Sequence, residues 1–209
     1  GLGDGLRTVR ETALPLAAAC REYGRERKVY LFSRRRGLEP GATIRGMAED
    51  QAEAMKKLGL WGADVLGISQ GGMVAQHLAA EAPELVRRLV LVATAGWANE
   101  TVQETVGRWL LLAEHGDHRR LTRDTAERSY SQRYLRRYRL LLPLLGTIGR
   151  PRSYQRFLIQ ARACLGHDAR GALAEHLSQS RLWIYPELGH GLYEEAADLP
   201  ARVLAFLSQ

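Results

Sequence analysis

The sequence predicts an α/β fold in which a mostly parallel sheet carries helices on both faces and an all-helical segment is inserted. In the first 96 of the 209 residues, short apolar runs alternate with segments of helical periodicity. Nearly continuous apolar strands separated by helices are typical of a parallel sheet that is covered on both faces. After Gly96 the chain becomes arginine-rich and helical, and an apolar run returns only near residue 181.

Four short runs are the expected strands, because they are apolar, rich in β-branched or aromatic residues, and of ordinary strand length. They are Lys28–Phe32 (KVYLF), Ala63–Ile68 (ADVLGI), Leu89–Ala93 (LVLVA) and Arg181–Tyr185 (RLWIY).

The expected helices lie between and beyond these runs. From Thr43 the apolar positions follow a helical period as far as Leu58, and Gly59 marks the stop. Further helices are expected over Leu14–Tyr23, over Met73–Ala82 and from about Asp198 to Leu207. Residues 1–96 and 174–209 are predicted to form the two parts of the core, and residues 97–173 a cap of three or four helices.

Composition excludes several classes of protein. Apolar residues make up 45% and charged residues 25%, unlike a disordered, collagen-like or coiled-coil chain. No apolar run reaches the ~18 residues of a membrane span, and no basic-then-apolar leader opens the chain. Cys20 and Cys164 are too few for a disulfide framework and lack metal-ligand spacing. We expect a cytoplasmic protein with no membrane partner, metal or cofactor, and the oligomeric state stays open.

The positive charge is confined to one segment. The formal net charge is +7, and residues 97–170 hold 14 arginines against 7 acidic residues, which accounts for the whole excess. A basic balance suggests nucleic acid, but the sequence has no base-stacking or groove-reading pattern, so we expect no nucleic-acid partner. Two explanations stay open: arginines on solvated helix faces, or steering of an anionic substrate.

The motif Gly67-Ile68-Ser69-Gln70-Gly71 is G-x-S-x-G between an expected strand and an expected helix. A sharp turn there would lift the Ser69 hydroxyl above the sheet edge and aim the helix N-terminus at the same point. The backbone N–H of Gln70 would face an oxyanion formed when Ser69 attacks a carbonyl. The alternative is a glycine-rich turn with an incidental serine.

A base for this serine is expected on the loop Gly189-His190-Gly191 beyond the last run. A serine hydroxyl is barely ionised near neutral pH and needs such a base, and a loop at the carboxyl end of a strand can reach across the sheet. The alternative is a solvated loop histidine. Trp97, directly after the third expected strand, is a candidate for lining the substrate pocket.

The chain resembles the α/β-hydrolase superfamily, in its capped esterase, enol-lactonase and proline-iminopeptidase-like branch. GISQGGMVAQHLAAEAPELVRRLVLVATAG resembles that branch's nucleophile elbow with the following helix and strand, and PELGHGLYEEAADLPARVLAFL resembles its histidine loop and last helix. Gly1-Leu2-Gly3-Asp4-Gly5 is similar to the end of its oxyanion loop, which implies that Leu2 supplies the second oxyanion N–H.

Two departures from the family pattern concern missing segments. The chain opens inside the oxyanion loop, without the first strands, and no strand bearing the third catalytic acid lies between the cap and the histidine loop. We expect that acid to be absent from these residues, with Glu100 the best candidate within them. A skipped segment predicts a spatial break near residues 173–175 and a missing sheet partner before Arg181–Tyr185.

These observations predict a serine hydrolase of carboxylic esters, lactones or similar small acyl substrates, which could be anionic. Ser69 would form an acyl-enzyme with His190 as base. Aminopeptidase, perhydrolase or C–C hydrolase chemistry on the same scaffold stays open, as does a catalytically silent binding homologue.

Overall fold

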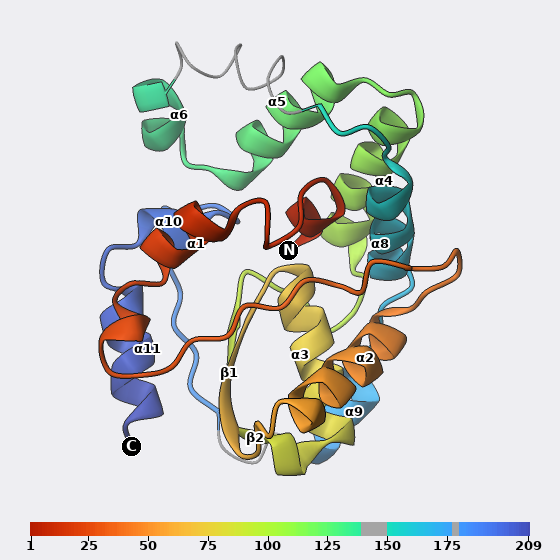
Figure 1. Cartoon of the computed structure of the whole chain (residues 1–209). Coiled ribbons are helices and arrows are strands. Elements are labelled where there is room, and N and C mark those ends of the chain that lie inside the picture. Colours follow the sequence, from red (N-terminus) through yellow and green to blue (C-terminus); the bar gives the residue numbers. More distant parts are fainter. Residues whose placement is uncertain (139–149, 177–179) are drawn as a thin grey trace.

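The computed structural model describes residues 1–138, 150–176 and 180–209. Its sheet consists of two parallel strands, β1 (Ala63–Ile68) and β2 (Val86–Val92), joined by helix α3 (Gln70–Glu81) (Figure 1). The register pairs Val65 with Leu89 and Ile68 with Val92. The predicted βαβ unit is therefore confirmed at its centre, although α3 begins three residues earlier than the periodicity suggested.

Helices cover both faces of the two strands. One face packs against α3, and α2 (Ile44–Lys57) and α9 (Arg170–His176) pack against α3. On the other face lies α11 (Leu199–Leu207) (Figure 1). It buries Leu199, Val203 and Leu207 against β2 residues Val90 and Val92. Thr43 begins α2 as expected, because its hydroxyl accepts a hydrogen bond from Gly46 N (3.0 Å).

The described part of the arginine-rich stretch consists of helices joined by short irregular segments. It contains α4 (Glu100–Glu114), α5 (His118–Ser129), α6 (Gln132–Tyr138) and α8 (Gln155–Leu165). The remaining short elements are η1 (Leu2–Gly5), α1 (Ala13–Ala19), η2 (Tyr23–Arg25), η3 (Pro83–Leu85) and α10 (Leu192–Glu195). No helix in the described ranges is long and apolar enough to span a bilayer.

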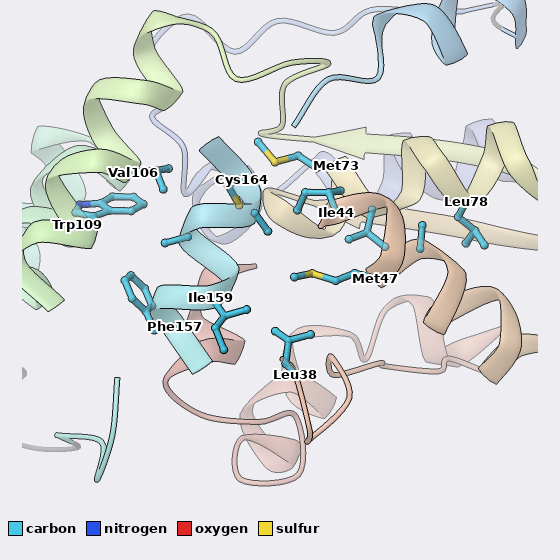
Figure 2. Close-up of a cluster of buried hydrophobic side chains, with 14 of the residues drawn as sticks. Leu38, Ile44, Met47, Met73, Leu78, Val106, Trp109, Phe157, Ile159 and Cys164 are labelled. Carbon is cyan, nitrogen blue, oxygen red and sulfur yellow. The ribbon is translucent and has the colours of Figure 1, made fainter. Parts of the chain in front are cut away.

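One buried cluster joins the helices α4 and α8 to the strand-bearing part (Figure 2). Val106 and Trp109 of α4 and Phe157 and Ile159 of α8 share it with side chains of α2 and α3. Because α4 and α8 share this cluster, they are held by the same core as the strand-bearing part and not by a separate one. Burial of apolar surface in it contributes roughly 25 cal/mol per Å².

Two expected strands are not strands in the structure. Residues 28–32 and 181–185 are irregular, and within the described ranges the only sheet is the β1–β2 pair. Leu182 and Ile184 are 83% and 75% exposed. An extended apolar segment becomes a strand only when a neighbour takes its backbone hydrogen bonds, and no described residue pairs as a strand with either segment.

The predicted break near residues 173–175 is wrong. Helix α9 runs through this position as one helix, and Leu173 N–H donates to Ala169 O (2.9 Å). The side chain of Asp168 accepts a hydrogen bond from Arg170 N (3.0 Å) and begins the helix. The local sequence therefore continues a helix where we expected a discontinuity.

Candidate active site

Ser69 occupies the single residue between β1 and α3. Its backbone angles are φ 57° and ψ −127°, a region that a residue with a Cβ rarely adopts. Its N–H donates to Val92 O (3.0 Å), which fastens the turn to β2, and its carbonyl accepts from Gly72 N (2.8 Å). The strand, the turn and the helix together hold Ser69 at the carboxyl end of the sheet, where ligands of open α/β sheets bind.

Close backbone approach explains two glycines of this turn. A Cβ on Gly67 would lie 2.7 Å from Gly72 Cα and 2.8 Å from Ala75 Cβ, and a Cβ on Gly72 would lie 2.6 Å from the side chain of Thr94. A Cβ on Gly71 would meet nothing nearer than Arg34 Nη2, at 3.9 Å. The strand thus approaches the helix through Gly67 and Gly72, whereas the last glycine of G-x-S-x-G is not crowded.

We therefore expect Gly67→Ala to destabilise the protein by about 2 kcal/mol or more, since the added methyl meets backbone atoms that cannot move aside. Gly71→Ala is the matched control and should change the free energy of unfolding by less than about 1 kcal/mol, because it adds a good helix former in open space. Urea unfolding of the two variants measures both values. Equal stability of the two variants would contradict this account of the turn.

His190 and Ser69 meet across 121 positions of sequence. The distance from His190 Nε2 to Ser69 Oγ is 2.9 Å, which is within hydrogen-bonding range. His190 lies in the turn that precedes α10. Desolvation by the groups packed around its ring lowers the pKa of His190 below its ordinary value of 6.5, although the residue as a whole stays exposed to solvent. The imidazole is therefore neutral at pH 7, the state in which Nε2 can accept the serine proton.

This pKa shift predicts the acid limb of the activity profile. A base must be unprotonated, so activity should be fully present at neutral pH and should be lost as the pH falls through the lowered pKa of His190. We expect the midpoint of kcat/KM for a neutral ester below pH 6.5, and a pH titration of initial rates locates it. A midpoint above that value would contradict a desolvated His190.

The loop that carries His190 is fastened to the junction of α5 and α6. Gly191 N donates to Ser129 O (2.6 Å), and Tyr130 Oη donates to Glu194 Oε2 (2.8 Å). Ser131 donates to Glu195 through its backbone N (2.9 Å) and through its hydroxyl. Sequence analysis did not identify these partners, because the two glutamates and the two α5–α6 residues are more than 60 positions apart.

The residues that carry the expected oxyanion donors lie near Ser69 in the chain or in space. Gln70 is the first residue of α3, so its backbone N–H has no intrahelical acceptor. Its buried side chain turns away toward α8, where Nε2 donates to Gln160 O (3.2 Å). The start of η1 lies beside the serine, because a Cβ on Gly1 would be 3.6 Å from Ser69 Cβ. Leu2 follows directly and is half-buried.

The structure does not join Trp97 to the serine–histidine pair. Trp97 is 43% exposed, forms an isolated β-bridge with Asp168, and lies under the guanidinium of Arg170, 5.3 Å from its ring centroid. No hydrogen bond or ring contact among the described residues links Trp97 to Ser69 or His190, so its expected role as a pocket wall has no support from these contacts.

No carboxylate of the described residues hydrogen-bonds to His190. The candidate Glu100 is exposed at the first turn of α4. Asp168 is paired with Arg170 (2.6 Å) and Asp198 with Arg202. Glu100 therefore does not serve as the third group in this structure.

Comparisons with known proteins assign the chain to a family. The model of the alpha/beta hydrolase fold matches residues 24–156, a range that contains Ser69 but ends before His190. Among solved structures, an alpha/beta hydrolase enzyme from a Medee basin deep-sea metagenome library is 22% identical, with a TM-score of 0.70, over 82% of this chain and 74% of that chain.

Two further similar structures are those of an enol-lactonase and an esterase. The enol-lactonase from Burkholderia xenovorans is 18% identical, with a TM-score of 0.70, over 83% of this chain and 76% of its own. An esterase from Exiguobacterium antarcticum is 17% identical, with a TM-score of 0.65, over 80% of this chain and 74% of its own. At these identities the likeness establishes the fold. The chain belongs to the alpha/beta hydrolase fold family.

Proposed function

We propose that this protein is a serine hydrolase of carboxylic esters, lactones or similar small acyl compounds. The observation that carries the proposal is the 2.9 Å distance from His190 Nε2 to Ser69 Oγ, with Ser69 in a strained turn between β1 and α3. A strained backbone at a serine that faces a neutral imidazole is costly and has no structural benefit of its own. The esterase and the enol-lactonase among the similar structures support the choice of substrate class.

In the proposed mechanism, Ser69 Oγ attacks the carbonyl carbon while His190 Nε2 takes the hydroxyl proton. The carbonyl oxygen becomes an oxyanion that the N–H groups of Gln70 and Leu2 stabilise. The C–O bond to the leaving group then breaks, the leaving alkoxide takes the proton from His190, and an acyl-enzyme remains. Water attacks this ester with His190 again as base, which releases the acid and restores the serine.

The proposed catalytic unit within the described residues is a serine–histidine pair. A carboxylate partner normally fixes the histidine tautomer, and its loss in a complete triad costs about 10⁴ in kcat. Here the bonds to Ser129, Tyr130 and Ser131 hold the histidine loop instead. They restrain the position of the histidine but not its tautomer.

The experiment that tests the proposal combines a probe with a substrate panel. A fluorophosphonate reacts only with an activated serine, and mass spectrometry should place its adduct on Ser69. Short-chain esters, lactones and prolyl amides should separate esterase or lactonase activity from aminopeptidase activity. If Ser69 stays unlabelled in the folded protein, the proposal is wrong and a catalytically silent binding homologue is the better explanation.

A further inference from the structure

Arg34 lies beside the turn that holds Ser69. Its Nη2 is 3.9 Å from the position that a Cβ on Gly71 would take, and Gly71 is the second residue of α3, two positions after Ser69. Arg34 is half-buried in the segment that leads from residues 28–32 toward α2. A positive side chain thus lies at the N-terminal turn of α3, where the helix dipole also favours an anion.

The guanidinium of Arg34 makes no hydrogen bond or ion pair with any described residue, and its Nε is buried without a hydrogen-bond partner. Its neighbours differ in this respect. Arg35 pairs with Asp50 (3.4 Å), and Arg156 pairs with Asp4 Oδ2 (2.7 Å). Burial of a charge is costly unless an opposite charge or hydrogen bonds compensate for it.

The nearby carboxylate of Asp4 is already engaged elsewhere. Its Oδ2 accepts from Arg156 Nη2 (2.7 Å), from the backbone N of Arg34 (3.2 Å) and from Gln160 Nε2 (3.3 Å). Its Oδ1 is buried without a partner and lies beyond ion-pair distance of the Arg34 side chain. The single negative charge of Asp4 pairs with Arg156 and also acts on the nearby Arg34, so the two arginines carry one positive charge more than Asp4 compensates.

The arginines of the helical stretch are weaker candidates than Arg34 for binding an anion. Several are paired with acids of the same stretch: Arg108 and Arg128 with Asp124, Arg123 with Glu127, Arg162 with Glu114, and Arg170 with Asp168. Their charges are therefore compensated on exposed helix faces. Arg34 differs from them in being half-buried, unpaired and adjacent to the serine turn.

We propose that Arg34 binds a carboxylate carried by the substrate, so that this hydrolase prefers anionic esters or lactones. The inference rests on the proposed function and names the substrate class of the same site. A guanidinium offers a planar fork of donors that matches a carboxylate with two parallel hydrogen bonds. Such a ligand would supply the acceptors that Arg34 does not find in the protein.

Matched substrates test the proposal on the unaltered protein. The 4-nitrophenyl half esters of succinate, glutarate and adipate carry a free carboxylate, and their methyl-capped counterparts have nearly the same shape without the charge. We expect at least one half ester to be hydrolysed with a kcat/KM about tenfold or more above its capped counterpart, after subtraction of the uncatalysed rate. The acetate esters of 4-hydroxybenzoate and of methyl 4-hydroxybenzoate test the same preference with the carboxylate placed on the leaving group.

The variants Arg34→Met and Arg34→Lys connect the preference to this side chain. In Arg34→Met the ratio of charged to capped kcat/KM should fall to about one, while Arg34→Lys should retain part of it, because an ammonium keeps the charge but not the fork. Arg36→Met is the control: this side chain is exposed, and its loss should leave the ratio unchanged.

Three outcomes would overturn the inference: no charge preference in the unaltered protein, a preference that survives Arg34→Met, or a thermal destabilisation of Arg34→Met with an unchanged ratio, which would show that Arg34 serves only the fold. Failure of the proposed function has a different signature, because neither charged nor capped esters would then be hydrolysed.

Discussion

Ser69→Ala is expected to lower the hydrolysis of a short 4-nitrophenyl ester by on the order of 10³-fold or more, the scale of loss when a hydrolase loses its serine nucleophile. Alanine keeps the turn and the Gln70 N–H but removes the only hydroxyl placed 2.9 Å from His190 Nε2. The activity that remains would come from the oxyanion donors acting on water.

Initial rates with purified protein measure this effect, and circular dichroism shows that the variant is folded. Ser180→Ala is the control, since Ser180 is exposed and outside the site; it should retain full activity. Fluorophosphonate labelling should disappear in Ser69→Ala alone. Hydrolysis undiminished in Ser69→Ala would exclude an acyl-enzyme on this residue.

His190→Gln is the second large effect, with an expected loss of about 10²- to 10⁴-fold in kcat/KM, the usual contribution of a general base. Glutamine can keep a hydrogen bond to Ser69 but cannot take its proton. The acid limb of the pH profile should vanish together with the activity, because the titrating group is gone.

The exposed His115→Gln is the matched control, because His115 lies at the end of α4 and bonds only to Leu111 O. It should leave both the rate and the pH profile unchanged. A rate for His190→Gln equal to that of the unaltered protein would mean that another group deprotonates Ser69.

The sequence predicted the features that depend on local residues. The strand over Ala63–Ile68, the helix behind Ser69 and the helix that begins at Thr43 all follow from short-range periodicity and capping, and all are present. The strands expected over residues 28–32 and 181–185 depend on a neighbour that supplies backbone partners. Composition cannot show whether such a neighbour exists, so both predictions were wrong.

The features of the site also divide into those that depend on local sequence and those that depend on long-range contacts. The G-x-S-x-G pattern identified Ser69 because its constraints lie within a few residues. The crowded glycines around it are Gly67 and Gly72, whereas Gly71 is not crowded. Glu194 and Glu195 lie in the first turn of α10, a position where acids are locally favoured. Their contacts with Tyr130 and Ser131 are long-range. The unpaired charge of Arg34 is likewise visible only once its neighbours are placed.

The fastening of the histidine loop has a thermodynamic consequence. Tyr130 and Ser131 at the α5–α6 junction hold Glu194 and Glu195, and His190 lies on the same loop. Any displacement of the junction that breaks these bonds also frees the loop from its position against Ser69. Breakage of these bonds and movement of His190 away from Ser69 are thus linked equilibria. A substrate that stabilises the hydrogen-bonded α5–α6 junction would stabilise the Ser69–His190 pair by the same free energy of coupling.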